Sequence, residues 1–539
     1  MRAIDLYAGI GGWSLGLRLA GAEIVSSYEY WRPAIDTHAE NHGEKFEPVD
    51  IRALRLDDLP TDIDMVVGSP PCTQFSYANR GGKGDIADGL KDLLKFFEVV
   101  EHLKPKFWAM ENVPRVAKVL EVAFSDPEHA LYRFKNLGGK IDVIDFSDFG
   151  TPQSRKRCIA TNIPFEHLEA FRARLPRRTL GDVLDALGSE DTIVDPVWGV
   201  ALPVSQVTDT EREPVLNPEE LRMNREAKEF HPVYNNMAFP EPKSEPARTV
   251  TATCTRVSRE SLVVEAGKGQ FRRLTIRERA CLQGFPITYQ FHARSFAEKA
   301  KMVGNAIPPT VPYLLALVAK GVRAEDFKGY PASAEKLSLP PKLGAKTNMD
   351  REGRTYPASR KFRAAIPGLR FKSGMRFDLS NNLNNSPPSW EVRFFYGPSK
   401  DIREIELDGE VTRELAQNEH LRPVLTRVAN LAQAQAGLLG KISPSSLQAV
   451  WAHTEEGIHP YQVVDLLGNI ASEVIDELEA AEVEGLDEYL IQVAAAETEA
   501  DRVPSELKLR RNATAIIAGL LVGDWFNEHE WHLPRRKAA

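Results

Sequence analysis

Cysteine is scarce in this sequence. Among its 539 residues there are only four cysteines, Cys72, Cys158, Cys254 and Cys281, and no two of them form a C-x-x-C pair. This scarcity excludes a disulfide framework and a zinc ribbon, so we predict no metal site. Widely spaced, unpaired cysteines are typical of proteins in a reducing cytoplasm, which is the localisation that we expect.

Long hydrophobic runs and an excess of positive charge are absent as well. The longest apolar stretch near the C-terminus, ATAIIAGLLVG, is much shorter than the about 20 residues that a membrane helix needs. The opening MRAIDLYAGIGG predicts a charged strand and a glycine turn rather than a secretion signal. A net charge of −8 does not indicate nucleic-acid binding by itself, although a DNA-binding cleft needs only a local basic patch.

The first residues predict a strand, a glycine turn and a helix in succession. AIDLY reads as a strand, AGIGG as the turn and WSLGLRLAGA as the helix, which together form the first step of a doubly wound α/β sheet. Gly9, Gly11 and Gly12 let backbone amides at a helix N-terminus approach a ligand closely. The G-x-G-G pattern differs from the dinucleotide pattern G-x-G-x-x-G, so it specifies no pyrophosphate, and a plain glycine-rich turn would look the same.

Acidic residues follow at two further strand ends. EIVSSYEYW predicts a second strand that ends at Glu29, about 20 residues after the turn, where an acid can bind ribose hydroxyls. VDIRAL predicts a third strand end, which places Asp50 and Ile51 beside the same crevice. The glycine turn and these acids together favour a nucleotide-like cofactor.

A cysteine stands directly after the next predicted strand. DIDMVVG leads into GSPPCTQFS, where two prolines form a stiff, non-helical shelf before Cys72. PKFWAMENVP predicts another strand, with Glu111 at its end. A thiolate and a carboxyl group at the carboxyl edge of the sheet suit attack on an electron-poor ring, with the acid assisting at a ring nitrogen. The alternative for a single cysteine after a strand is an inert core residue.

Several segments up to about residue 325 resemble the DNA (cytosine-5)-methyltransferase family, and they occur in that family's order. In this chain DLYAGIGG resembles the family's cofactor loop, with Tyr7 where phenylalanine is usual. GSPPCTQFS resembles the family's nucleophile block. The remaining blocks are similar to MENVP, FGTPQSRKRCIA, RRLTIRERACLQGFP and MVGNAIPP. The resemblance implies a Rossmann-like methyltransferase sheet with a smaller target-recognition lobe.

The resemblance also implies a reaction. A methyl group from S-adenosyl-L-methionine goes to C5 of a cytosine that is flipped out of specific duplex DNA sequences. Cys72 adds to C6 of the ring, Glu111 binds N3 and Arg157 holds O2. In RKRCIA the strand period places Arg155 on the same face as Arg157, so both are expected at the catalytic site.

The resemblance implies binding residues for the cofactor and for DNA. The last block returns to the first, so Asn305 is expected near the methionine end of the cofactor. The cofactor residues expected are Tyr7, Ala8, Gly9, Gly11, Gly12, Glu29, Tyr30, Asp50, Ile51, Pro70, Asn305 and Ala306. The DNA-contacting residues expected are Ser76, Arg80, Lys83, Arg248, Arg256 and Arg259, and the arginines among them can read guanine or touch phosphates.

The chain divides into six predicted segments. A catalytic domain at 1–164 is followed by a target-recognition region at 165–270, a return to the catalytic domain at 271–330 and a linker at 331–350. Residues 351–410 predict a small basic β-rich module, because 351–403 hold eleven Lys and Arg against four Asp and Glu, interleaved with aromatics. Residues 411–539 show helical spacing of apolar residues. The module either grips DNA backbone or packs on the enzyme, and the helices serve dimerisation, partner binding or DNA positioning.

The expected partner is double-stranded DNA, together with a restriction endonuclease of the same site unless the enzyme is solitary. Two alternatives remain: a tRNA cytosine-5 methyltransferase, and a DNA-binding regulator on the same fold. An amino-methyltransferase is disfavoured because the residue after Ser69, Pro70 and Pro71 is a cysteine rather than a stacking aromatic. The segment WEVRF lacks the E-x-K core of a fused nuclease.

Overall fold

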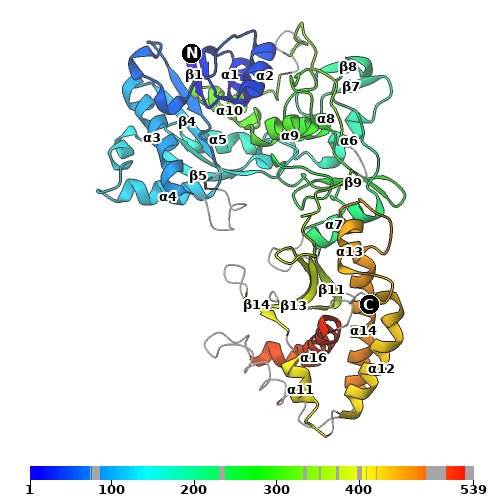
Figure 1. The fold of residues 1–539 in the computed structure, drawn as a ribbon. Coiled ribbons are helices and arrows are strands. Elements are labelled where there is room, and N and C mark those ends of the chain that lie inside the picture. Colours follow the sequence, from blue (N-terminus) through cyan, green and yellow to red (C-terminus); the bar gives the residue numbers. More distant parts are fainter. Residues whose placement is uncertain are drawn as a thin grey trace. The chain divides into compact units, whose positions relative to one another are not determined.

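The protein is described here by a computed structural model that forms two compact units (Figure 1). Unit 1 comprises Met1–Glu229 and Met237–Asp350, and unit 2 contains the described residues from 354 onward. The structure describes residues 1–72, 74–75, 85–229, 237–331, 337–350, 354–371, 375–396, 403–407, 409–419, 422–480, 488 and 506–528.

Unit 1 is built on a six-stranded sheet with the order β2-β1-β3-β4-β6-β5. Strands β2, β1, β3 and β4 are parallel, and β6 runs antiparallel to both of its neighbours. The strands are β1 (Arg2–Leu6), β2 (Glu23–Tyr28), β3 (Met65–Gly68), β4 (Phe107–Asn112), β5 (Lys140–Asp145) and β6 (Lys156–Thr161).

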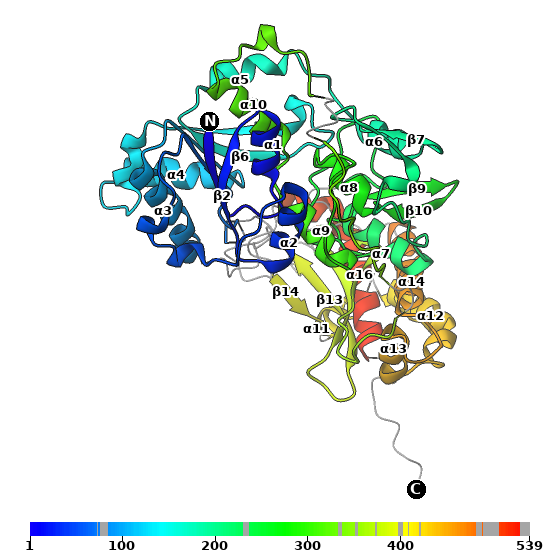
Figure 2. The same ribbon diagram turned by 90° about the horizontal axis from the view of Figure 1, so that it is seen from above.

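Helices cover both faces of this sheet, since its central strands are apolar on both sides. Val66 points into a core with Phe96 of α3, whereas its neighbour Val67 points into the core that contains Trp13 of α1. Helices α3 and α4 therefore lie on one face, and α1, α5 and α10 on the other (Figures 1 and 2). The predicted doubly wound α/β fold is confirmed. The helices of this layer are α1 (Gly12–Leu19), α2 (Arg32–His42), α3 (Ile86–Leu103), α4 (Arg115–Ser125), α5 (Phe165–Arg172) and α10 (Thr310–Ala319).

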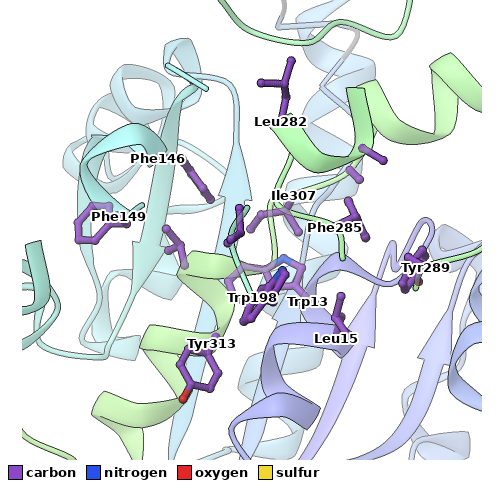
Figure 3. Close-up of a cluster of buried hydrophobic side chains, with 14 of the residues drawn as sticks. Trp13, Leu15, Phe146, Phe149, Trp198, Leu282, Phe285, Tyr289, Ile307 and Tyr313 are labelled. Atoms are coloured by element: carbon purple, nitrogen blue, oxygen red, sulfur yellow. The ribbon is translucent and has the colours of Figure 1, made fainter. Parts of the chain in front are cut away.

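The last helix of the sheet layer returns to the first, because a glycine lets the two approach closely. A Cβ atom at Gly16 of α1 would lie only 2.5 Å from the Pro309 carbonyl oxygen, just before α10. Trp13, Trp198 and Tyr313 belong to the buried cluster beside this contact (Figure 3). The stretch Phe296–Ala319 has the length and apolarity of a membrane span, but it is mostly buried in this core.

The rest of unit 1 holds short elements between and after the sheet strands. The helices are α6 (Leu180–Leu187), α7 (Pro218–Glu229), α8 (Ile276–Leu282) and α9 (Phe296–Asn305), and the strands are β7 (Thr192–Val194), β8 (Ala201–Pro203), β9 (Val263–Gly267) and β10 (Gln270–Arg273). The 3₁₀ helices are η1 (Ile51–Ala53), η2 (Leu56–Asp58), η4 (Tyr132–Leu137), η5 (Phe146–Phe149), η6 (Val204–Gln206) and η7 (Ala324–Asp326).

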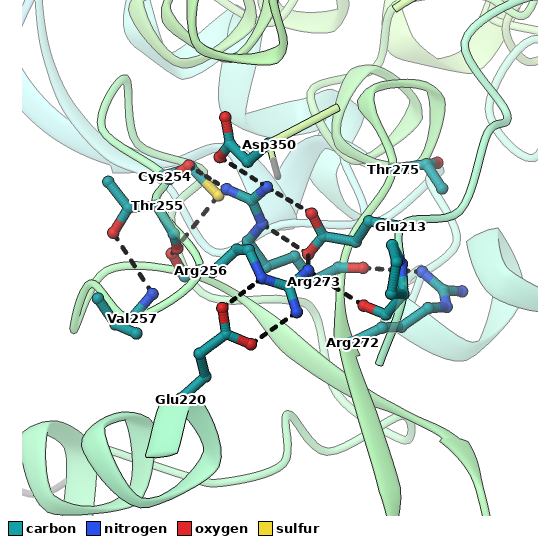
Figure 4. Close-up of polar contacts among 12 residues, drawn as sticks. Glu213, Glu220, Cys254, Thr255, Arg256, Val257, Arg272, Arg273, Thr275 and Asp350 are labelled. Carbon is teal, nitrogen blue, oxygen red and sulfur yellow. Dashed lines mark hydrogen bonds and ion pairs between the residues drawn. The ribbon is translucent and has the colours of Figure 1, made fainter. Parts of the chain in front are cut away.

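Buried ion pairs hold α7 and the strand β10 together (Figure 4). Arg256 donates to both carboxylate oxygens of Glu220 at 2.6 Å. Arg273 donates to Glu213, with 2.7 Å from its Nε, and to Asp350 at 3.0 Å. Apart from the exposed Asp350, these charges are almost fully removed from water, so each of them depends on its partner for stability.

Residues 337–350, for which the sequence predicts part of a linker, pack along unit 1; we call this segment the strap. Its Thr347 hydroxyl donates to Asp209 at 2.6 Å, and its Ala345 carbonyl accepts from Lys299 at 2.5 Å. Lys299 and Asp209 form an ion pair at 2.5 Å, and both side chains are buried. The strap therefore completes the polar contacts of a buried charge pair.

Unit 2 combines an antiparallel sheet with helices in a single core. Helix α14 packs on β11, where a Cβ at Gly468 would lie 3.0 Å from the Pro367 ring. Helix α16 packs on β13, and its Gly519 similarly admits the ring of Phe377. The strands are β11 (Arg363–Arg370), β12 (Arg376–Asn382), β13 (Ser389–Tyr396) and β14 (Arg403–Glu406). The helices are α11 (Glu410–Leu415), α12 (Arg422–Leu439), α13 (Pro444–Trp451), α14 (Pro460–Ala480) and α16 (Glu506–Glu528).

Candidate active site

The order of the strands fixes where a site can form in unit 1. The chain moves from β1 outward to β2 and then crosses back to β3 on the other side of β1. At such a reversal the loops after the two central strands diverge and leave a crevice at their carboxyl ends. The glycine turn follows β1 and the proline shelf follows β3, so both predicted motifs flank this crevice.

The proline shelf is held from two sides. Trp13 Nε1 donates to the Ser69 hydroxyl at 3.0 Å, and Asn112 Nδ2 donates to the Pro70 carbonyl at 3.0 Å. Proline has no backbone donor, so the shelf takes part in these two bonds through its acceptor oxygens. The next residue, Cys72, is partly exposed, whereas Cys158 and the other two cysteines are buried.

An acid and an arginine meet beside the shelf. Glu111 lies in β4, and because β6 runs antiparallel to β4, the start of β6 brings Arg157 to the same edge. Arg157 Nε lies 3.0 Å from Glu111 Oε1, with both side chains largely buried. The pair lies close enough to Cys72 to act on its ionisation.

Burial raises the pKa of the Cys72 thiol, and the Glu111 carboxylate raises it further. Arg157 and Arg155 oppose this shift by stabilising the thiolate. The thiol is therefore protonated at neutral pH until charges around it change. An arriving ligand that neutralises Glu111 would remove one of the two causes that disfavour the thiolate, and burial would remain.

Arg155, which the strand period predicts on the same face as Arg157, is held by backbone carbonyls of later segments. It lies just before β6, and its buried guanidinium donates to the carbonyls of Val250, Gly304 and Ala306, each at 3.1 Å. Burial, together with the charge of Arg157, lowers the pKa of Arg155 to about 9. Arg155 thus joins the start of β6 to two later segments, while its charge still acts on the Cys72 thiol.

The glycine turn is anchored by Glu29. Its carboxylate accepts from the Gly9 backbone N–H at 2.9 Å and from those of Tyr30 and Trp31 at 2.7 and 2.8 Å. Gly9 and Gly11 have φ values of +53° and +88°, which a residue with a Cβ rarely adopts. Nothing lies within 4 Å of the position of a Gly9 Cβ, so the turn opens toward free space there. The ring of Tyr30 is 71% exposed beside it.

The late segment with Asn305 contacts the glycine turn. A Cβ at Gly12 would lie 2.1 Å from the Ile307 carbonyl oxygen, so only glycine permits this approach. Asn305 is exposed and Ala306 is buried. The expected return of the last block to the first is therefore present in the fold.

The segment with Asp50 is not a strand end. Residues Ile51–Ala53 form η1, because the Asp50 carboxylate accepts from the Arg52 backbone N–H at 3.0 Å and caps this short helix. Ile51 is buried, and the segment lies at the crevice through its link to Glu29, whose carbonyl accepts from the Val49 N–H at 2.9 Å.

Two buried glutamines near the site were not predicted. Gln153 Oε1 accepts from the Val250 N–H at 2.6 Å, and its amide group donates to Gln283 Oε1 at 2.8 Å. Gln283 in turn donates to the Val303 carbonyl at 2.6 Å. Both residues occur in the quoted sequence blocks, but nothing local indicates that their amides pair across 130 residues.

The arginines expected to contact DNA are placed differently from one another. Arg256 is buried, and each of its nitrogens donates to a carboxylate or a carbonyl, with Pro214 and Val215 adding to Glu220, so these contacts tie it to the interior and its contact with DNA stays a prediction. Arg248 is paired with Glu241, and its side chain is 26% exposed. Arg259 is half-buried. Ser76, Arg80 and Lys83 lie outside the described residues.

Comparison with known proteins agrees with this arrangement. The family model described as C-5 cytosine-specific DNA methylase matches residues 1–319. The Type II methyltransferase M.FnuDI of Fusobacterium nucleatum is 27% identical over 341 residues, which cover 59% of this chain and 93% of that protein. M.NgoPII of Neisseria gonorrhoeae is 28% identical over 339 residues and is covered to 95%, and M.HgiDI of Herpetosiphon aurantiacus is 29% identical over 324 residues and is covered to 93%.

Each of these Type II enzymes thus aligns over almost its whole length with the first part of this chain. The matched residues contain the glycine turn, the proline shelf, the Glu111–Arg157 pair and the segment around Asn305. With more than half of its length matched, this chain belongs to the C-5 cytosine-specific DNA methylase family.

Proposed function

We propose that this protein transfers a methyl group from S-adenosyl-L-methionine to C5 of cytosine in duplex DNA through a covalent bond to Cys72. The proposal rests on the partly exposed Cys72 thiol, which follows the proline shelf and lies near the largely buried ion pair of Glu111 and Arg157. A nucleophile beside an acid and a cation suits addition to an electron-poor ring.

The residues present fit the proposed cofactor. The turn at Gly9 has left-handed backbone, open space in front of it and the N-terminus of α1 behind it. Glu29 already accepts three backbone N–H groups, two at Oε1 and one at Oε2, so Oε2 keeps a further lone pair for a ribose hydroxyl. The exposed Tyr30 ring offers a surface for a purine. When bound, the cofactor supplies an electrophilic methyl group.

Three residues of the chain have separate roles in the proposed reaction. The Cys72 thiol loses its proton to solvent as its sulfur forms a bond to C6 of the flipped base, while Glu111 holds a proton at N3 and Arg157 binds O2. Electrons that move from the C5–C6 double bond make C5 the nucleophile for the methyl group. Loss of the C5 proton restores the double bond and expels the sulfur as thiolate. Flipping is needed because a stacked base leaves no room for this addition.

We infer further that residues 165–270 read the target and that the enzyme belongs to a Type II restriction–modification system. The first inference is supported by the position of this segment between the two parts of the catalytic layer. The second is supported by the Type II names of the relatives. A tRNA substrate is not favoured by these relatives.

Trapping with a duplex oligonucleotide that carries 5-fluorocytosine tests the covalent step. Fluorine at C5 cannot leave as a proton does, so protein and DNA should remain joined at Cys72 when S-adenosyl-L-methionine is supplied. Peptide mass spectrometry locates the bond. The same DNA sequence made as RNA serves as the control, and an adduct with RNA alone would contradict the DNA substrate.

The cofactor site is tested by Gly11→Val. Its side chain would clash with His42 Nε2, which lies 2.6 Å from the added Cβ, and a β-branched residue is strained at φ +88°. We expect the affinity for S-adenosyl-L-methionine to fall at least about tenfold, measured by calorimetry. An unchanged affinity would place the cofactor elsewhere.

Bisulfite sequencing of DNA from cells that express the chain gives the target sequence. Protected cytosines at one short motif are expected, and their absence would contradict the proposed activity.

A further inference from the structure

The hydroxyl group of Tyr7 is a feature of this chain, because the resembled cofactor loop usually has phenylalanine there. This hydroxyl donates to Asp92 in α3, at 3.3 Å to both the carboxylate Oδ1 and the main-chain carbonyl. Burial raises the pKa of the Tyr7 phenol, so the group keeps its proton and acts as the donor. The first residue of the glycine turn, with φ +55°, is thereby tied to a helix on the other side of the crevice.

The same carboxylate holds a second segment of the candidate cofactor site. Arg52 Nε donates to Asp92 Oδ1 at 2.9 Å, and Arg52 Nη2 donates to Oδ2 at 2.7 Å. Two parallel bonds of this kind fix orientation as well as distance. The other side of the guanidinium binds Asp88, with 2.8 Å to Oδ1. The backbone N–H of Arg52 is bonded to Asp50, so this arginine places Asp50 and Ile51 relative to α3.

Asp92 stands on a rigid element. Its side chain is 7% exposed, and α3 buries Leu93, Phe96 and Phe97 in the core beneath the sheet. The two segments that it holds are, by contrast, a glycine turn and a 3₁₀ helix of three residues. A binding site formed by such segments gains affinity when a rigid neighbour pre-organises them.

We propose that Asp92 positions the two cofactor-binding segments, 7–12 and 50–52, relative to each other, and that the Tyr7 hydroxyl is the link by which the first segment is fixed. Asp92 and Arg52 are positioning residues here and touch no reacting atom. This inference rests on the proposed binding of S-adenosyl-L-methionine at the crevice.

The first test is Tyr7→Phe, which restores the residue usual in the family and removes only one oxygen. We expect the Kd for S-adenosyl-L-methionine, measured by calorimetry with the full chain, to rise about three- to tenfold. The KM for the cofactor should rise equally, while kcat at saturating cofactor and the KM for DNA change less than twofold. The thermal unfolding midpoint should stay within about 2 °C.

A matched control removes a tyrosine hydroxyl that is not bonded to Asp92. Tyr132 in η4 serves this purpose, because among the described residues its hydroxyl accepts a hydrogen bond from Lys135. Tyr132→Phe should leave the cofactor affinity unchanged. An equal loss in both variants would show a general effect of lost packing and would overturn the assignment.

A double-mutant cycle tests whether the effect passes through Asp92. In the Asp92→Ala background, Tyr7→Phe should cost less cofactor affinity than it does in the wild type, because the carboxylate acceptor is already gone and only the bond to the main-chain carbonyl of residue 92 remains. Independent, multiplying effects would overturn the proposal. Should Asp92→Ala not fold, Arg52→Lys replaces it as the test of the second segment; it keeps a charge but loses the paired bonds, and an unchanged cofactor Kd would overturn the role of Arg52.

Failure of the inference and failure of the proposed function give different results. Wild-type protein that binds no S-adenosyl-L-methionine would contradict the proposed function. Wild-type binding with an unaffected Tyr7→Phe variant would contradict only the positioning role of Asp92.

Discussion

The six-stranded sheet of unit 1 and the four-stranded sheet of unit 2 use arginine in different ways. In unit 1, Arg157 meets Glu111 at the carboxyl edge of parallel strands, beside a thiol. In unit 2, Arg363 and Arg376 meet Asp378 along antiparallel strands, at 2.7 and 2.8 Å. The ion pairs are alike, but the Glu111–Arg157 pair lies at the carboxyl ends of parallel strands and beside a thiol. The position of a pair in the fold, and not the residue types, therefore decides whether it has a chemical role.

The comparison is tested most strongly at the thiol. Cys72→Ala should lower methyl transfer at least about a thousandfold, because the covalent step is lost, while cofactor affinity stays within about twofold. Activity is measured with tritiated cofactor and affinity by calorimetry. Cys158→Ala is the matched control, since this cysteine is buried in β6 and should keep its activity. Full activity in Cys72→Ala would exclude covalent catalysis.

Removing a cation from the buried ion pairs of unit 1 should lower the stability of the fold. Arg256→Met leaves Glu220 buried without its cation, which costs about 3–5 kcal/mol of unfolding free energy, measured by denaturant titration. Arg177→Met removes a cation from a largely exposed pair with Glu245 and should change stability by less than about 1 kcal/mol. A stable Arg256→Met variant that binds DNA weakly would instead support the prediction that Arg256 contacts DNA.

A buried carboxyl in β1 gives a pH-dependent prediction. Burial raises the pKa of Asp5 from its ordinary 3.8 to about 8, and its Oδ1 has no partner among the described residues. Because the folded state binds this proton more tightly, its contribution to stability is complete below about pH 4 and is lost as pH rises toward 8. Relative to Asp5→Asn, the wild type should lose up to about 1.4 kcal/mol of unfolding free energy per pH unit in this window. Parallel curves for the two proteins would contradict the shift.

The smallest effect is expected in unit 2. Arg393 is paired with Glu391 at 2.6 Å and also contacts Glu404, so its charge is already neutralised. Arg393→Met should leave methylation within about twofold and lower stability by less than about 1 kcal/mol. A tenfold loss of DNA affinity, with a smaller salt dependence of binding, would instead support the module as a DNA-gripping surface.

The sequence predicts best what neighbours along the chain determine. The glycine turn after β1 and the shelf before Cys72 were placed correctly because glycine and proline act on their own backbone. The strand predicted at VDIRAL was wrong, because the Asp50 side chain competes with a strand by capping η1.

The partners of long side chains cannot be predicted in this way, because they come from segments far away in the sequence. The strand period was taken to give the face of Arg155, but it could not show that three carbonyls from distant segments would take up its donors. The same holds for Arg256, whose partner Glu220 lies 36 residues away. The aromatics of unit 2 suggested a nucleic-acid surface, yet Phe362, Phe377 and Trp390 are buried core residues.

The strap bears on where the gene can be divided. An expression clone that stopped at residue 319, where the family match ends, would strip Thr347 and Ala345 from the Lys299–Asp209 pair. It would also take Asp350 from Arg273. Such a fragment keeps the residues proposed for catalysis, but its buried Lys299 loses a partner and must be hydrated instead. A clone that ends just after residue 350 keeps the partners of Lys299.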